Sequence, residues 1–290
     1  MSPTVASGGI DFHTHPVLVR EMVQRHPELE RAAREVFHIG NVFQPLETFL
    51  LELDVAGLEQ AVLLPIDCTT TRGMPIYTNE QVAELCAMSD RFIGFASVDP
   101  HDPQHVQALE RAVGDLGLRG LKLAPGLQGF RPDDRALYPL YAKAQDLGIP
   151  VLFHAGMTWE PGVRVGAGHP LAFEEVARDF PALKIVLAHL AWPWVLEAVA
   201  LALKYPNVFL DTSALYVDNP RDFLAFAMGQ QVPLSVWERS LRHQLVFGSN
   251  YPRVEIKNMA AAVRALGLSP GGLDLVFRRN AARLLGLEGL

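Results

Sequence analysis

The feature that most constrains the fold is a regular alternation of short apolar runs with longer amphipathic stretches along the whole chain. This alternation is typical of βαβ units, whose strands are parallel. Each run is almost continuously apolar, as expected for strands that are covered on both faces. Eight runs with helical crossovers therefore predict an α/β fold of the closed (β/α)8 TIM-barrel type. The expected strands are residues 8–13, 60–66, 91–98, 119–124, 150–155, 184–189, 207–212 and 244–249.

Helix signals lie between these runs. Thr78 and Gln81 have the spacing of a capping box and predict a helix that continues to about Met88. Residues 16–59 are long for a first connection and contain two helical patterns, so we expect a helical insertion after strand one that covers the barrel mouth. Residues 273–287 are apolar at helical spacing and predict a terminal helix that closes the barrel.

Composition narrows the class of protein. The chain has 290 residues, of which 49% are hydrophobic and 20% are charged, so we expect residues 1–290 to form a single folded domain. The formal charge of −7 argues against nucleic acid, whose recognition needs clustered Lys and Arg. The N-terminus lacks the pattern of a secretory signal, and no apolar run approaches the roughly 20 residues of a membrane span. We therefore expect a cytoplasmic protein with no membrane partner.

Histidines mark the carboxyl ends of three expected strands. The first run ends in Asp-Phe-His-Thr-His-Pro, so His13 and His15 lie two positions apart and can point to the same side of a strand. His154 ends the fifth run and His189 ends the sixth. Barrel active sites lie at this face, so imidazoles from these strands can reach one metal ion. The alternative for any one of these histidines is a buried ring hydrogen-bonded to the backbone.

Two charged residues lie on other expected strands. Lys122, on the fourth, needs a partner inside the barrel, which can be a carboxylate, an anionic substrate or, if the lysine is carboxylated, two metal ions. We expect the amine itself rather than the carboxylated form. Asp211 ends the seventh strand and can orient a histidine, act as a base or serve as a structural hydrogen-bonding group.

The eighth run ends on an unexpected residue type. In LVFGSNYPR the strand-end position that often carries an ionisable group is occupied by Asn250. Its amide oxygen can contact a metal ion or accept a hydrogen bond, but the amide cannot accept a proton at neutral pH.

Taken together, these residues resemble the amidohydrolase superfamily from DFHTH to the closing RRNAARLLGL. The sequence motifs are similar to those of the branch that includes small metal-dependent hydrolases, lactonases and the aminocarboxymuconate semialdehyde and γ-resorcylate decarboxylases. The resemblance implies one divalent metal ion, with zinc first and manganese second, held by His13, His15, His154 and Asn250. It also implies that His189 contacts the metal-bound water or the developing charge.

In that family the residue at Asn250 is normally an aspartate, as in FGSDYP, which ligates the metal and takes the proton of the water. Losing a general base costs roughly 100-fold to 10,000-fold in rate unless another group replaces it. His189 and Asp211 are the candidates for this role. Three accounts stay open: a natural enzyme with another base, an inert relative, and an aspartate deliberately changed to asparagine.

The expected function is metal-dependent hydrolysis of a small lactone, amide or related C–O or C–N bond. One alternative is a non-oxidative decarboxylase of a small unsaturated or aromatic acid, and another is a catalytically impaired binding protein. The expected partner is a small-molecule substrate, and assembly into a homo-oligomer is left open. Candidate substrate contacts on or after strands four to six are Lys122, Arg131, Arg135, Arg164, Trp159, Trp192 and Trp194.

Overall fold

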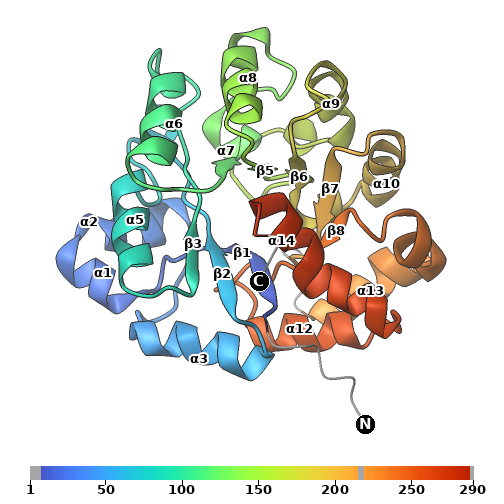
Figure 1. Cartoon of the computed structure of the whole chain (residues 1–290). Helices are drawn as coiled ribbons and strands as arrows, with labels where there is room; N and C mark the ends of the chain where they lie inside the picture. The colour runs from blue at the N-terminus through green and yellow to red at the C-terminus, as the bar shows by residue number, and fades with distance from the viewer. Residues whose placement is uncertain (1–7, 215–218, 288–290) are drawn as a thin grey trace.

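The computed structural model describes residues 8–214 and 219–287 and has eight parallel strands at its centre (Figure 1). All eight expected strands are present, although each is shorter than its apolar run. They are β1 (Ile10–Thr14), β2 (Gln60–Leu63), β3 (Phe92–Gly94), β4 (Leu121–Leu123), β5 (Val151–Phe153), β6 (Ile185–Leu187), β7 (Val208–Asp211) and β8 (Leu245–Val246).

The strands close into a barrel. Strands β1 to β3 pair in sequence order, and so do strands β4 to β8. A parallel bridge between Ala96 and Leu121 joins the two sets on one side, and a bridge between Thr14 and Tyr251 joins them on the other. The predicted TIM barrel is thus confirmed.

Helices surround the barrel and fill the connections (Figure 1). The connection after β1 contains three α-helices and a π-helical turn, so the predicted insertion is present and has one short helix more than expected. Up to β4 the helices are α1 (Arg20–Arg25), α2 (Glu28–Arg31), η1 (Ala32–Val36), α3 (Leu46–Ala56), α4 (Thr69–Arg72), α5 (Asn79–Ala87) and α6 (His105–Gly114).

The second half of the chain follows the same alternation. Between β4 and β7 lie α7 (Pro125–Gln128), η2 (Arg135–Leu137), α8 (Tyr138–Asp146), η3 (Val165–Ala167), η4 (Pro170–Phe173), α9 (Glu174–Asp179), η5 (Ala188–Ala191) and α10 (Val195–Lys204). From β7 onward they are α11 (Pro220–Ala225), η6 (Phe226–Gln230), η7 (Val236–Ser240), α12 (Ile256–Arg264), α13 (Pro270–Asp274), η8 (Leu275–Arg279) and α14 (Asn280–Leu285).

Local sequence explains where several of these elements begin and end. The N–H of Gln81 donates to Thr78 Oγ1 at 3.2 Å and the N–H of Thr78 donates to Gln81 Oε1 at 2.9 Å, which is the predicted capping box of α5. Helix α3 ends at Gly57, whose φ of 68° lies in the left-handed region that glycine adopts without strain.

The barrel interior is a packed apolar core that is closed at one end by the C-terminal helix. Strand residues such as Phe12, Phe95 and Leu152 share one buried cluster with Leu284 and Leu285 of α14. Helix α14 lies across this end of the barrel (Figure 1). The site described below therefore lies at the opposite end, after the carboxyl ends of the strands. No helix in the part of the chain that the structure describes has the length and apolar character to cross a membrane.

Candidate active site

Two buried imidazoles face each other at the end of β1. The pairing register of β1 with β2 shifts between Asp11 and Thr14, and such irregularities redirect side chains beside active sites. His13 Nε2 and His15 Nε2 lie 3.2 Å apart, and both residues are buried. Two nitrogens that each lie about 2.1 Å from one ion are about 3.0 to 3.4 Å apart in tetrahedral or octahedral geometry.

The hydrogen bonds of the other ring nitrogens fix the state of this pair. His13 Nδ1 lies 2.7 Å from Asp211 Oδ2, and His15 Nδ1 lies 2.9 Å from the carbonyl oxygen of Leu64. Both partners are acceptors, so each ring carries its proton on Nδ1 and a lone pair on Nε2. Burial, reinforced by neighbouring charges, holds the pKa of both rings well below the usual value, which disfavours a second proton. Two facing lone pairs repel unless a cation lies between them, so this donor set fits a metal ion.

A buried network beneath this pair holds the histidines in place. Donor atoms of His13, His189 and Asp211 lie within 4.8 Å of one another, which makes them a His/His/Asp group that could hold a metal ion. The Ser213 hydroxyl donates to Asp211 Oδ1 and lies 3.2 Å from His13 Nδ1 and 2.8 Å from His189 Nδ1. Because these atoms are already bonded to one another, Asp211 acts as the group that orients the imidazoles.

Glycine at position 248 permits this close packing. A Cβ atom there would lie 2.8 Å from His13 Cβ and 3.4 Å from Asp211 Cγ, so any side chain would displace one of the two. The glycine of the FGS part of the strand-eight motif is therefore required for steric reasons.

His189 and His154 approach the same space from β6 and β5. His189 begins a left-handed turn with φ of 60°, and its backbone N–H donates to Asp211 Oδ1 at 2.9 Å. Non-glycine residues in this region carry strain that recurs at functional sites. His154 Nε2 lies 3.0 Å from the carbonyl oxygen of Met157, and burial lowers the pKa of this ring to about 4. The two ring centroids are 5.0 Å apart. Burial also holds the pKa of His189 well below its usual value, so at neutral pH both imidazoles are uncharged.

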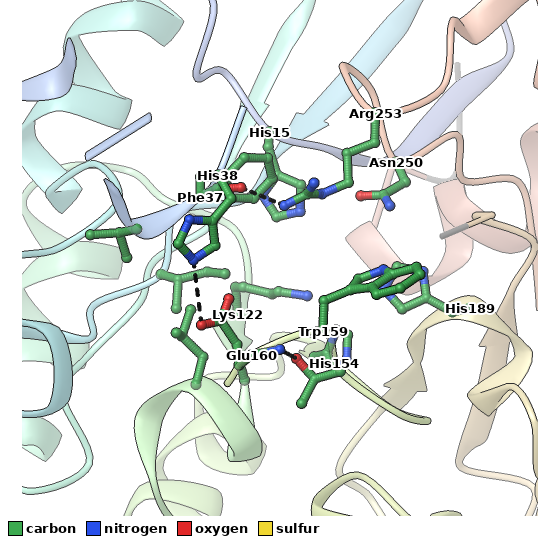
Figure 2. A pocket seen from close by; sticks show the side chains of 15 residues that line it. His15, Phe37, His38, Lys122, His154, Trp159, Glu160, His189, Asn250 and Arg253 are labelled. Atoms are coloured by element: carbon green, nitrogen blue, oxygen red, sulfur yellow. Dashed lines mark hydrogen bonds and ion pairs between the residues drawn. The ribbon is translucent and has the colours of Figure 1, made fainter. Parts of the chain in front are cut away.

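Asn250 also lies at this site, in a backbone conformation that suits its residue type. Its φ is 67°, a region that asparagine and aspartate enter more readily than most residues. Its Nδ2 donates to the carbonyl oxygen of Ala214 at 3.0 Å. Figure 2 shows the amide oxygen turned toward the middle of the pocket.

These groups open into a cavity of about 320 Å³ at the barrel mouth, within the size range of small-molecule sites. Apolar side chains such as Phe37 and Trp159 lie beside the polar groups in this cavity (Figure 2). The lining residues are His15, Val36, Phe37, His38, Ile66, Lys122, Ala124, Leu127, His154, Thr158, Trp159, Glu160, His189, Asn250 and Arg253.

Three loops meet at the rim of this cavity. Glu160, in the loop after β5, pairs with Arg72 of α4 at 3.0 Å and with His38 of the β1 insertion at 3.8 Å. The insertion therefore forms part of the cavity wall, where the sequence led us to expect it.

The structure brings together some of the candidate site residues and separates others. His15, Lys122, His154, Trp159, His189 and Asn250 line the cavity, and His13 and Asp211 lie buried beside it. Arg131, Arg164 and Trp192 are not among the lining residues.

Two arginines that were candidate substrate contacts pair with other partners. The side chain of Arg131 is 77% exposed and pairs with Asp133 at 2.8 Å. Arg135 pairs with Asp179 at 2.8 Å, also on the surface. Both arginines follow strand four in the sequence, but nearby carboxylates hold them outside the barrel.

Several residues of the site were not among the candidates from the sequence, including Phe37, His38, Glu160, Ser213 and Arg253. Ser213 and Arg253 had a usable signal, because Ser213 lies two residues after Asp211 and Arg253 ends the LVFGSNYPR motif. The other three depend on how long loops fold over the mouth.

Comparison with known proteins agrees with this geometry. Residues 10–287 match the amidohydrolase family. The chain belongs to this family.

Among curated proteins it is 30% identical over 86 residues to 2-amino-3-carboxymuconate-6-semialdehyde decarboxylase of Dictyostelium discoideum, a match that covers 29% of this chain and 23% of that protein. It is 29% identical over 135 residues to 2-keto-4-carboxy-3-hexenedioate hydratase of Sphingobium, which covers 37% of this chain and 40% of that protein. The matched segments thus span less than half of either relative.

Solved structures share the whole fold. An uncharacterized TIM-barrel protein of Bordetella bronchiseptica is 27% identical, with a TM-score of 0.77 and coverage of 98% of this chain and 100% of that one. A dihydroxybenzoic acid decarboxylase of Polaromonas with bound manganese and 2-nitroresorcinol is 17% identical, with a TM-score of 0.66 and 98% coverage of both chains. An aspartate-to-asparagine variant of 5-carboxyvanillate decarboxylase of Novosphingobium aromaticivorans, also with manganese, is 16% identical, with a TM-score of 0.65 and coverage of 97% of this chain and 98% of that one.

Proposed function

We propose that this amidohydrolase-family chain is a metal-dependent lyase that decarboxylates a small unsaturated or aromatic acid. One observation carries the proposal: the buried ammonium of Lys122 lines the cavity beside neutral imidazoles, and the cavity offers it no carboxylate partner. Among the lining residues that the structure describes, the one carboxylate is Glu160, which is bound at the rim by Arg72 and His38. Such a cavity attracts an acid.

The acid–base groups of the site also disfavour the hydrolase that the sequence suggested. Activation of water needs a group that takes its proton. Asn250 cannot do so at neutral pH, and the Asp211 carboxylate is already bonded to His13, His189 and Ser213. This leaves His189, which in the present proposal delivers a proton to the substrate carbon instead of taking one from water. The named curated relatives, a decarboxylase and a hydratase, also act on unsaturated acids.

The residues of the chain have distinct tasks in this proposal. His13 and His15, and on the family pattern His154 and Asn250, would hold one divalent ion, which would polarise the oxygen atoms of the substrate. The imidazole donors suit zinc, whereas two solved structures of this fold contain manganese.

His189 is the residue assigned to proton transfer. Its Nδ1 lies 2.8 Å from the Ser213 hydroxyl, which donates to Asp211, so a second proton that the ring takes up as the anionic substrate binds would be supported by a buried carboxylate. In the reaction the bond between the substrate carbon and its carboxylate breaks, the electron pair stays on that carbon and takes the proton, and carbon dioxide leaves. Lys122 binds the carboxylate before it departs.

The test is a metal-reconstituted substrate panel. Protein stripped with EDTA and reloaded with Mn²⁺ or Zn²⁺ is given 2,6-dihydroxybenzoate, 5-carboxyvanillate, 2-amino-3-carboxymuconate-6-semialdehyde, an aryl lactone and an aryl amide. We expect release of carbon dioxide from at least one acid, with one proton consumed per turnover, and no opening of the lactone or amide. Metal-dependent hydrolysis without carbon dioxide release would overturn the proposal, as would water addition to an unsaturated acid as the sole reaction. The His13→Ala variant is the control for adventitious metal catalysis.

A further inference from the structure

Ser213 is a buried hydroxyl that lies beside two imidazoles of the site. It follows the end of β7 by two residues, is fully buried, and is not one of the residues that line the cavity. Its oxygen lies 2.8 Å from His189 Nδ1 and 3.2 Å from His13 Nδ1. A hydroxyl in this place does not line the space that a ligand occupies, so its effect on a reaction passes through the imidazoles.

The proton of this hydroxyl is donated to Asp211 Oδ1. The same Oδ1 accepts the backbone N–H of His189 at 2.9 Å and that of Ser213 at 3.0 Å, so this carboxylate oxygen is an acceptor in all three contacts. A serine hydroxyl has a single proton, and Asp211 receives it. Toward the imidazoles, Ser213 Oγ therefore presents its lone pairs.

Two acceptors thus lie beside the Nδ1 atom of His189. One is Ser213 Oγ, and the other is the backbone carbonyl oxygen of the same serine, at 3.3 Å. Because both are acceptors, the favoured form of the ring is the one in which Nδ1 carries the proton. In the uncharged ring the lone pair then lies on Nε2. The contact with the hydroxyl is the shorter of the two, so Ser213 Oγ contributes most of this preference.

We propose that Ser213 is a positioning residue that selects the Nδ1–H tautomer of His189 and so directs proton exchange with a ligand to Nε2. The tautomer is a property of the resting protein, and its consequence for turnover rests on the proposed decarboxylase function. As an acid binds, Nε2 takes a proton from solvent while Nδ1–H stays donated to Ser213. When the bond between the substrate carbon and its carboxylate breaks, this proton moves from Nε2 to that carbon, which keeps the electron pair, and carbon dioxide leaves.

Loss of the hydroxyl should allow the other tautomer to form. With alanine at position 213, the longer of the two contacts, to the backbone carbonyl oxygen, remains beside Nδ1. A neutral ring that carries its proton on Nε2 cannot accept a second proton there. It cannot serve as the donor either, because giving up its one N–H proton would leave an imidazolate.

Nitrogen-15 NMR of the metal-free protein tests the tautomer without turnover. In protein labelled on histidine, long-range ¹H–¹⁵N spectra at pH 7.5 distinguish protonated from unprotonated ring nitrogens, and the His189→Gln variant identifies the His189 signals. We expect a protonated Nδ1 and an unprotonated Nε2 in the wild-type protein, and a second tautomer in Ser213→Ala. Ser213→Thr keeps the hydroxyl and should show the wild-type pattern.

The wild-type spectrum alone can refute the inference, even if neither variant folds. A proton on Nε2 in the wild-type protein would overturn it, and so would a Ser213→Ala spectrum that matches the wild type. Ser249→Ala is the matched control, because Ser249 is an equally buried serine after β8 whose hydroxyl donates to the carbonyl oxygen of His13 at 3.4 Å rather than to Asp211. A second tautomer of His189 in this control would mean that loosened packing, and not the Ser213 hydroxyl, decides the tautomer.

Kinetics then separate positioning from packing. On an acid that the substrate panel identifies, and at saturating Mn²⁺, Ser213→Ala should lower kcat about 10-fold to 100-fold, the range typical of partners that orient an imidazole in an active site. KM should stay the same, since Ser213 does not line the cavity. Ser213→Thr should recover most of kcat. Equal losses of kcat in both variants would show that the serine acts through packing and would overturn the inference.

The two proposals fail in different ways. A substrate panel without carbon dioxide release would refute the decarboxylase, whereas the tautomer is measured in the metal-free protein and would still stand. A wild-type His189 that carries its proton on Nε2 would refute the role of Ser213, whichever reaction the chain catalyses.

Discussion

Replacing Lys122 by methionine should stabilise the metal-free protein, although the residue lies in the barrel core. The ammonium is 1% exposed and has no hydrogen-bond partner among the described residues, and burial lowers its pKa from 10.5 to about 7 against the opposing influence of Asp211. Methionine has a similar length and keeps the apolar stem in contact with the core. The variant therefore loses a desolvation penalty and little packing.

The size and sign of the effect follow from this pKa. A pKa that drops from 10.5 to about 7 corresponds to a penalty of about 5 kcal/mol at about 1.4 kcal/mol per pH unit. Below pH 7 the lysine is protonated in both states, so the penalty is complete. Between pH 7 and 10.5 only the unfolded chain binds the proton, so the stability of the wild-type protein rises with pH and the penalty is gradually lost. Relaxation of the protein around the charge makes the real penalty smaller than this value. We therefore expect Lys122→Met to raise the free energy of unfolding by about 2 to 4 kcal/mol at pH 6.

Urea unfolding in EDTA at pH 6, 7.5 and 9 measures this gain. The advantage of Lys122→Met should be largest at pH 6 and shrink steadily toward pH 9. The control is Lys184→Met, because Lys184 Nζ donates to the carbonyl oxygens of Gly148 and Leu284 at 3.1 and 3.0 Å and its loss should destabilise the protein. A Lys122→Met protein that is less stable at pH 6, or whose advantage does not change with pH, would show that the ammonium is already compensated.

Two further variants test the metal centre. Asn250→Asp should bind Mn²⁺ at least tenfold more tightly, since it adds an anionic ligand. The free energy of unfolding of its metal-free form should fall by about 1 to 2 kcal/mol, because two facing oxygens replace the hydrogen bond from Nδ2 to the Ala214 carbonyl. Chelator competition and urea unfolding measure the two effects, and unchanged affinity would place the ion away from Asn250. Asp211→Asn should weaken Mn²⁺ binding about 10-fold to 100-fold, because Asp211 fixes the Nδ1 proton of His13. Equal affinity by the same competition assay would mean that His13 does not need this carboxylate.

The barrel could be predicted because strand burial leaves a direct mark on sequence. Each strand is covered on both faces, so it appears as an apolar run, and all eight runs become strands. Their lengths were overestimated, as where residues 91–98 were expected and β3 covers Phe92–Gly94. The residues after the paired part of each strand no longer form strand-to-strand hydrogen bonds and instead make contacts at the barrel mouth. The Ser97 hydroxyl, for example, donates to the carbonyl oxygen of Lys122 at 2.8 Å.

The site was predictable where a side chain leaves directly from a strand end. His15, His154 and Asn250 are placed by strand geometry and all line the cavity. Residues further into the loops were not predictable, because their direction depends on partners distant in sequence. Arg253 is placed by Phe37, 216 residues away in the chain.

The charge of the site gives Asn250 a physical rationale. A divalent ion and the ammonium of Lys122 would share a cavity whose described lining contributes one carboxylate, Glu160, and that carboxylate is bound at the rim. An aspartate at position 250 would neutralise part of this positive charge permanently. The neutral amide of Asn250 does not, so the full positive charge can attract an anionic ligand. The carboxylate of an acid substrate would then supply the negative charge that the lining lacks, so substrate binding and metal binding should reinforce each other. In this arrangement the hydrogen bond from Asn250 to Ala214 keeps the amide oxygen toward the pocket, and the neutral residue favours capture of an acid over activation of water.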